Sequence, residues 1–179
     1  MIPNFQEKTG FTKNQPIIVA GNLTQEKAGY LYSLPAEPAY NLYGVGFDES
    51  RALENENYFG SFLPDELPAA LEGGFGLVWG NSENPEDERD YYKENISYKL
   101  STYLSAGLPV VVPDYLSNAD YIREKGLGFV ASSLEEANRL VQDCTEEEYA
   151  QMVRKAQYTS YLIAMAILQR NYLSIPSWL

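Results

Sequence analysis

Short apolar runs and longer mixed segments alternate along this chain, in the order expected of parallel strands joined by helices. The apolar runs have the length of strands and stand at residues 16–20, 39–45, 75–79, 108–112 and 129–131. Glycine or proline lies at most junctions, where it ends one element and starts the next. Because strands that alternate with helices form a parallel sheet, we predict an α/β protein with an open parallel sheet and helices on both faces.

Helices are predicted between these runs and after the last of them. The expected helices are 24–34, 64–71, 95–106, 117–124, 134–142, 146–157 and 159–173, with one further short strand at 58–62. The helix at 64–71 is expected to begin with Pro64, because proline suits the first helical position. Two helices begin with the pattern of a capping box, which pairs Ser133 with Glu136 and Thr145 with Glu148.

The length and charge of the chain set limits on its organisation and partners. A chain of 179 residues supports one hydrophobic core. We expect residues 1–15 to be a lead-in or linker, residues 16–157 to form the main α/β domain and residues 158–179 to be a C-terminal helical segment. The net charge of −12 argues against nucleic acid and anionic membranes as partners, because both are polyanions. The apolar run at 161–168 is too short to span a bilayer.

Several kinds of active site are excluded by the residues that the chain lacks. It has no histidine, the commonest general base and zinc ligand, and Cys144 is its single cysteine. A lone thiol excludes a disulfide framework and suits a reducing compartment, so we expect a cytoplasmic protein. The motifs GxxxxGK[ST] and GxSxG are absent, as is a GxGxxG after a strand, and no carboxylate pair stands out as acid and base. Catalytic residues are therefore unassigned, and we expect no metal site.

The loop after the first strand is the first candidate for a ligand-binding segment, since open parallel sheets bind ligands at the carboxyl ends of their strands. Gly21 lets the backbone approach a ligand closely, and Asn22 offers both a donor and an acceptor. Lys27 lies one turn into the next helix and could reach a phosphate. The alternatives are an ordinary tight turn and a solvated surface lysine.

The second candidate is the turn that ends the second strand, at Tyr43, Gly44, Val45 and Gly46. A flat base could lie against this loop and read its backbone groups. An ordinary turn explains the same residues if the loop is considered alone. The interpretation therefore depends on whether the fold brings this loop to the same edge of the sheet as the others.

The third candidate is the start of the helix at 95–106, which contains Ser97, Tyr98 and Lys99. Helix N-terminal N–H groups next to an ammonium group form a site for an anion, and Tyr98 adds a hydroxyl. The next helix start, at Ser117 and Asn118, offers further N–H donors at the same predicted edge. Helix capping alone, or a lysine on a plain helix surface, would explain the same residues.

Residues 97–129, SYKLSTYLSAGLPVVVPDYLSNADYIREKGLGF, resemble the C-terminal half of a GT-B glycosyltransferase. The chain is most similar to the bacterial family that contains adhesin-modifying glucosyltransferases and β-1,6-galactofuranosyltransferases. Further matching pieces are G-N-L at 21–23 with Lys27, and G-G-F-G-L-V-W at 73–79. The resemblance covers residues 16–157 and keeps the order of the elements.

The resemblance implies a Rossmann-like domain that binds a UDP-sugar as donor substrate and needs no cofactor. By position, Lys27 and Lys99 would hold the diphosphate, and residues 43–45 would face the uracil. Tyr98 and residues 117–118 would line the phosphate and sugar end of the site. A metal-binding DxD motif is absent. The transferred group would be a hexosyl group, either glucosyl or galactofuranosyl.

Members of this family also carry an N-terminal Rossmann-like domain that binds the acceptor, here expected to be a glycan or a glycoprotein. We expect this chain to be the C-terminal half of such an enzyme, rather than a solitary donor domain. It would then bind UDP weakly and transfer nothing alone. A catalytic base, where the mechanism inverts, would come from the other half.

The competing interpretation is a non-catalytic α/β interaction module. In that case the sheet edge or the final helix would bind a partner, or a homo-oligomer would form through Tyr161, Leu162, Met165 and Leu168. A signalling receiver domain would need an aspartate at the end of a central strand, and the sequence there is Trp79-Gly80-Asn81. Nucleotide affinity would distinguish the enzyme from the interaction module.

Overall fold

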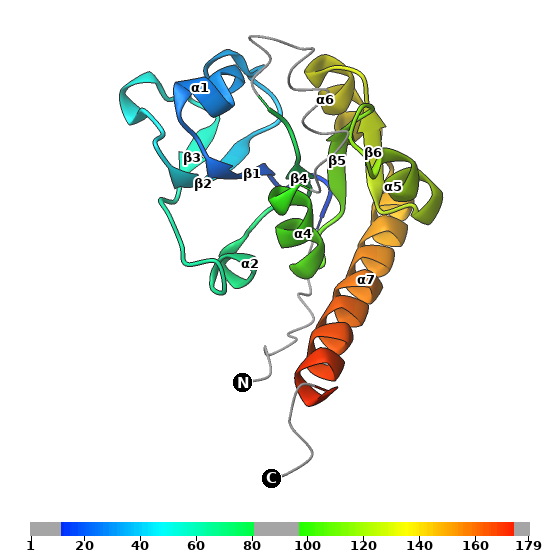
Figure 1. The fold of residues 1–179 in the computed structure, drawn as a ribbon. Helices are drawn as coiled ribbons and strands as arrows, with labels where there is room; N and C mark the ends of the chain where they lie inside the picture. Colours follow the sequence, from blue (N-terminus) through cyan, green and yellow to red (C-terminus); the bar gives the residue numbers. More distant parts are fainter. Residues whose placement is uncertain (1–11, 81–96, 174–179) are drawn as a thin grey trace.

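The computed structural model describes residues 12–80 and 97–173, which fold around a six-stranded sheet (Figure 1). All six strands are parallel, in the order β3-β2-β1-β4-β5-β6. This confirms the predicted open parallel sheet, and the order is that of a doubly wound Rossmann sheet. The bounds are Ile17–Asn22 (β1), Tyr40–Val45 (β2), Glu56–Tyr58 (β3), Gly76–Leu77 (β4), Val110–Pro113 (β5) and Gly128–Ala131 (β6).

Both faces of the sheet are apolar, because successive side chains of a strand point to opposite faces. On β1, Ile17 and Val19 belong to one buried cluster, and Ile18 and Ala20 belong to the other. Helices cover each cluster, as the predicted three-layer arrangement requires. The first face carries α1 (Gln25–Ala28), the 3₁₀ helix η1 (Gly29–Ser33) and α6 (Leu134–Asp143), and the second carries α2 (Leu67–Ala70), α4 (Tyr98–Ser105) and α5 (Ala119–Lys125).

The segment predicted as one helix at 24–34 folds instead as two short helices, α1 and η1. Ala28 has φ −144° and ψ 34°, which lie outside the helical range, so the α-helix ends there. Tyr30, Leu31 and Leu34 are nevertheless buried, as the apolar pattern predicts. The pattern thus identifies the buried residues but does not distinguish an α-helix from a 3₁₀ helix.

Other element boundaries differ by a few residues from the predictions. The short strand expected at 58–62 is β3 and ends at Tyr58, and another 3₁₀ helix, η2 (Glu49–Arg51), lies in the loop before it. Helix α2 starts at Leu67, with Pro68 rather than Pro64 in its first turn. Helix α4 begins at Tyr98 with Ser97 as its N-cap, and residues 95–96 of its predicted start and the acidic stretch before them lie outside the described residues.

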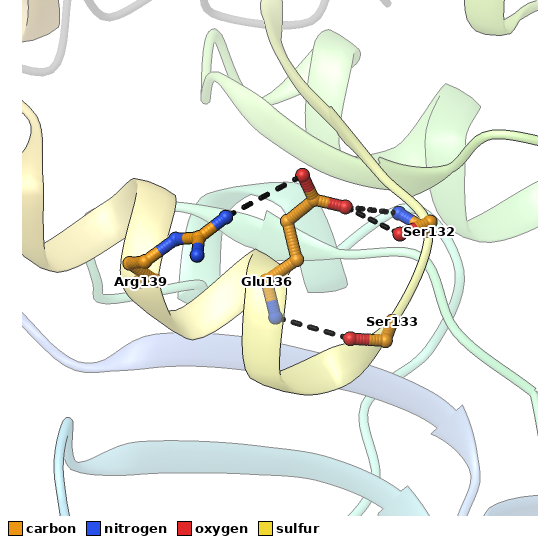
Figure 2. A network of polar contacts seen from close by, with 4 residues as sticks. All are labelled: Ser132, Ser133, Glu136 and Arg139. Carbon is orange, nitrogen blue, oxygen red and sulfur yellow. Dashed lines mark hydrogen bonds and ion pairs between the residues drawn. The ribbon is translucent and has the colours of Figure 1, made fainter.

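Of the two predicted capping boxes, the one at Thr145 is complete and the one at Ser133 is present in a modified form. The Oγ of Ser133 accepts a hydrogen bond from the N–H of Glu136 at 3.2 Å. The Glu136 carboxylate accepts from the N–H and hydroxyl of Ser132, at 2.7 and 2.6 Å, so the return bond goes one residue before the helix cap (Figure 2). Thr145 and Glu148 form the reciprocal pair at the start of the next helix, at 2.9 and 3.2 Å. At the starts of α6 and α7, side chains therefore bond to backbone N–H groups of the same segment.

The two helices predicted at 146–157 and 159–173 form one continuous helix, α7 (Glu146–Leu173), orange to red in Figure 1. The predicted boundary between residues 157 and 158 therefore lies inside a helix. Thr159 and Ser160 follow this point, and their hydroxyls donate to the carbonyls of Lys155 and Ser105 at 2.9 and 2.7 Å. These bonds satisfy the hydroxyls without interrupting the helix, and the second one ties α7 to the end of α4.

Candidate functional site at the carboxyl edge of the sheet

The carboxyl ends of the strands bring the predicted site segments to one edge of the sheet. The strands β2 and β4 lie on opposite sides of β1. The segments after β1 and β4 lead to opposite faces, because α1 packs on one face and α4 on the other. This is the topological switch point, the place where open α/β sheets bind ligands.

Lys99 lies at this switch point. It belongs to the first turn of α4, and its Nζ donates to the carbonyl of Trp79, just after β4, at 2.7 Å. A Cβ atom placed on Gly21, near the end of β1, would lie 3.5 Å from the Cε of Lys99. The lysine side chain therefore spans the ends of β1 and β4, and the fold brings together two of the residues predicted for the site.

Tyr103 is not among the residues predicted from the sequence, although it lies one turn after Lys99 on the same side of α4. It is fully buried, and its hydroxyl accepts from the N–H of Ala20 at 2.8 Å and donates to the carbonyl of Leu77 at 3.2 Å. Its ring covers Gly76, where a Cβ atom would overlap it. The spacing of four residues from Lys99 is visible in the sequence, but the contact with two strands is not.

The starts of α4 and α5 face this edge with little side-chain capping. Among the described residues, neither Ser97 nor Asn118, the respective N-caps, accepts a capping hydrogen bond with its side chain. Ser97 is buried, whereas Ser117 and Tyr98 are exposed, Tyr98 to 60%. The first turn of α4 contains no acidic residue in the part of the chain that is described. The backbone N–H groups of α4 are therefore placed where an anion would benefit from them.

The loop after β1 is held by its own side chains. Gly21 has φ +125°, a conformation that favours glycine. The Oδ1 of Asn22 accepts from the N–H of Thr24 at 3.0 Å, which makes Asn22 part of the turn. Lys27 lies 3.6 Å from the carboxylate of Glu26, and 62% of its side chain is exposed. The fold therefore places Gly21 against Lys99, whereas Lys27 lies on the exposed surface of α1.

The three residues predicted to face a base belong to the end of β2 rather than to a loop after it, and they have different surroundings. Only 1% of Tyr43 is exposed, its ring stacks on Phe59 with centroids 4.9 Å apart, and burial raises the pKa of its hydroxyl. The N–H of Gly44 donates to the carbonyl of Gly60 at 2.7 Å. In contrast, 56% of Val45 is exposed. A base at this strand end would therefore meet Val45 and backbone atoms, not the ring of Tyr43.

A hollow of about 540 Å³ lies elsewhere, between α5 and α7. Its lining includes Lys125, Arg154 and Lys155, together with the rings of Tyr121 and Tyr158. Helix α5 ends here, so the hollow lies toward the amino ends of the strands, opposite the candidate site. Its lysine side chains can therefore serve as controls in experiments on Lys99 at the switch point.

The remaining groups with unusual surroundings offer little for catalysis. Burial raises the pKa of the Cys144 thiol to about 11, so the reactive thiolate is a minor form near neutral pH. Burial also raises the pKa of Glu56, whose Oε2 accepts from the N–H of Leu53 at 2.8 Å. Within residues 12–80 and 97–173, no three His, Cys, Asp or Glu side chains are grouped to hold a metal ion. No helix in these ranges combines the length and apolar character needed to cross a membrane.

A family model described as "Glucosyltransferase 3-like, C-terminal domain" matches residues 17–174. The chain belongs to this family. The match runs from the first residue of β1 through the whole of α7 and includes the edge that holds Gly21 and Lys99. The resemblance inferred from the sequence motifs is thereby confirmed.

Individual relatives agree with this assignment. The chain is 50% identical over 127 residues to Glucosyltransferase 3 of Streptococcus gordonii, covering 70% of this chain and 38% of that protein. It is 32% identical over 168 residues to the β-1,6-galactofuranosyltransferase WbbI of Escherichia coli, covering 90% of this chain and 49% of that protein. The chain thus spans less than half the length of these two relatives.

A solved structure shows the same fold. Anabaena HepE, crystallised in complex with UDP-glucose, matches with a TM-score of 0.52 at 14% identity, covering 86% of this chain and 49% of that one. At this identity the likeness concerns the fold alone, which is that of one half of a GT-B glycosyltransferase. The predicted fold class is therefore confirmed.

Proposed function

We propose that this chain is the donor-binding half of a glycosyltransferase and that it binds the UDP portion of a UDP-sugar at the switch point. Membership of a glucosyltransferase family and the UDP-glucose complex of a structural neighbour support this proposal. The observation that carries it is the position of Lys99, whose ammonium group and aliphatic stem lie at the ends of β4 and β1.

The proposed site divides the nucleotide between three strand ends. Lys99 and the N–H groups of α4 hold the diphosphate, because an ammonium and a helix N-terminus both favour negative charge. The uracil lies against Gly44 and Val45 after β2, with Gly21 between the two parts. Tyr98 and the start of α5, at residues 117–118, line the sugar end. Lys99 would stabilise the charge that develops on the departing diphosphate.

The identity of the sugar and acceptor rests on the relatives. One is named a glucosyltransferase and another a galactofuranosyltransferase, so we propose transfer of a glucosyl or galactofuranosyl group. A glycan or glycoprotein acceptor would bind to an additional N-terminal domain, because these relatives are more than twice as long as the matched part. The catalytic base of an inverting reaction is assigned to that domain. The cytoplasm remains the expected location, on the basis of the single thiol.

Titration of the chain with UDP and with uridine by calorimetry tests the site. We expect Lys99→Ala to weaken UDP binding about tenfold, the effect of losing one charge-assisted hydrogen bond. Uridine lacks the diphosphate, so its affinity should not change. Lys125→Ala is the matched control, because it removes the same charge from the hollow between α5 and α7. Equal UDP affinity of wild type and Lys99→Ala would contradict the assigned role.

The interaction module is a second candidate because α7 exposes apolar side chains. Tyr161, Leu162 and Met165 are 46%, 47% and 37% exposed. A partner or a second copy that binds them would be compatible with donor binding elsewhere on the domain. Light scattering of wild type and Leu162→Asp, combined with the UDP titration, separates the two functions. Self-association without UDP affinity would favour the interaction module.

A further inference from the structure

The strands β1 and β4 separate at the edge where the proposed site lies. Their ladder has one registered pair, Ile18 with Gly76, and the N–H of Ile18 donates to the carbonyl of Phe75 at 2.7 Å. In a continuing parallel ladder, the next N–H of β1 on this side, that of Ala20, would donate to the carbonyl of Leu77. The two strands instead part at this point.

The hydroxyl of Tyr103 occupies the position of this missing hydrogen bond. It accepts from the N–H of Ala20 at 2.8 Å and donates to the carbonyl of Leu77 at 3.2 Å. One inserted oxygen therefore satisfies both backbone groups and keeps the strands further apart than a direct bond would. Gly76 leaves room for the ring, because a Cβ atom there would overlap Tyr103.

Lys99 lies between the same two strands, beyond Tyr103 toward their carboxyl ends. It precedes Tyr103 by four residues, so the two side chains leave α4 on the same side. Its stem lies beside Gly21, directly after Ala20 on β1, and its Nζ donates to the carbonyl of Trp79, two residues after Leu77. These two contacts of Lys99 thus depend on strand ends whose separation Tyr103 sets.

We propose that Tyr103 is a positioning residue for nucleotide binding: its hydroxyl wedges β1 and β4 apart and thereby places Lys99 at the diphosphate. This inference rests on the proposed function of the site. Tyr103 is fully buried and therefore acts through the strands and Lys99 rather than by contact with the ligand. Without its hydroxyl, the N–H of Ala20 either loses its partner or bonds directly to Leu77, and the second outcome narrows the opening.

The test compares Tyr103→Phe with Tyr149→Phe. Tyr149 is also a buried tyrosine whose hydroxyl donates to a carbonyl near β4, that of Gly74 at 2.8 Å, but it packs on the opposite face. Both variants lose a buried hydrogen bond, so both should melt at a lower temperature. Stability alone therefore does not test the positioning role, whereas UDP affinity does.

A double-mutant cycle with Lys99→Ala isolates the coupling. We expect Tyr103→Phe to weaken UDP binding about tenfold in the wild-type background and less than about twofold in the Lys99→Ala background. Tyr149→Phe should leave UDP affinity unchanged in both. Equal effects of Tyr103→Phe in the two backgrounds, or no effect in either, would overturn the inference while leaving the role of Lys99 intact.

A measurement without ligand separates this inference from the proposed function. In a chain with ¹³C-labelled lysines, the Cε resonance of Lys99 is identified by its loss in Lys99→Ala. We expect it to shift in Tyr103→Phe and to stay in place in Tyr149→Phe. In the wild type, a nuclear Overhauser effect between the Lys99 Cε protons and Gly21 should report the contact directly, even if Tyr103→Phe does not fold. The positioning role would be refuted if the Lys99 resonance did not shift in Tyr103→Phe and the wild type showed no Overhauser effect to Gly21. Failure of the wild type to bind UDP would instead refute the proposed function.

Discussion

The N-termini of α4 and α6 have the same place in the architecture and opposite chemistry. Each helix follows a strand and begins at the carboxyl edge of the sheet. At α6, Ser133 and Glu136 bind the backbone of their own segment, and the first turn is acidic (Figure 2). At α4, Ser97 makes no such bond among the described residues, and the first turn carries Lys99.

This difference shows why one edge of a sheet offers unequal places for a phosphate. A helix N-terminus attracts an anion only where its N–H groups and local charge are not already balanced by the protein. The carboxylate of Glu136 fulfils that role at α6, and Thr145 with Glu148 does so at α7. At α4 the proposed function assigns the corresponding negative charge to the diphosphate of the ligand.

Reversing the charge of Lys99 should give α4 the character of α6 and have the largest effect. We expect Lys99→Glu to weaken UDP binding by about a hundredfold or more, because like charges placed together cost several kcal/mol. Calorimetry measures this effect, with Lys125→Glu as the control of equal charge change. Comparable losses in the two variants would point to the overall charge of the chain rather than to the switch point.

Removing the two cap hydroxyls should affect folding unequally. Ser133→Ala should lower the free energy of unfolding by about 1 kcal/mol, the usual cost of a lost N-cap. Ser97→Ala should cost less, since Ser97 caps no N–H among the described residues. Urea denaturation of the two variants measures this difference in stability. Ser133→Ala should leave the affinity for UDP unchanged, because α6 lies outside the proposed site. A larger loss in Ser97→Ala would contradict the assignment of side-chain capping to α6 rather than to α4.

The order of elements and the candidate edge could be predicted because they depend on local patterns. Apolar runs, glycine junctions and the serine–glutamate spacing identify the strands, turns and capping boxes that the structure contains. Lys99 could be placed at the carboxyl edge for the same reason, since any helix that follows a parallel strand begins there. The position of Gly21 beside it follows from the strand order, which local patterns do not contain.

Other features depend on contacts between distant segments, and these the sequence did not reveal. The ring of Tyr43 is buried because Phe59, from the segment after β3, stacks on it. The hydroxyl of Tyr103 bonds to both β1 and β4 because these strands separate beside it. The hydroxyl of Ser160, inside the continuous α7, donates to the carbonyl of Ser105 at the end of α4. Such contacts arise only once the strands have been ordered in space.

The acidic cap of α6 should also give the protein a specific dependence on pH. Hydrogen bonds from Ser132 hold the pKa of Glu136 below its usual range, so the folded state favours the ionised carboxylate. Its contribution is complete above the unfolded pKa and is lost as the pH falls through the lower folded pKa. We expect the difference in melting temperature between wild type and Glu136→Gln to shrink from about pH 6 to about pH 3. A constant difference would contradict the role of the ionised group.

The smallest effect is expected at Lys27, the second lysine that the family resemblance assigns to the diphosphate. Its ammonium lies 3.6 Å from Glu26 and its side chain is largely exposed, whereas Lys99 is held between two strand ends. An exposed, flexible side chain must lose rotamer freedom to reach a ligand, which offsets much of the gain. Calorimetry should therefore show about a twofold loss of UDP affinity in Lys27→Ala, smaller than in Lys99→Ala. A larger loss in Lys27→Ala would mean that α1 rather than α4 holds most of the phosphate charge.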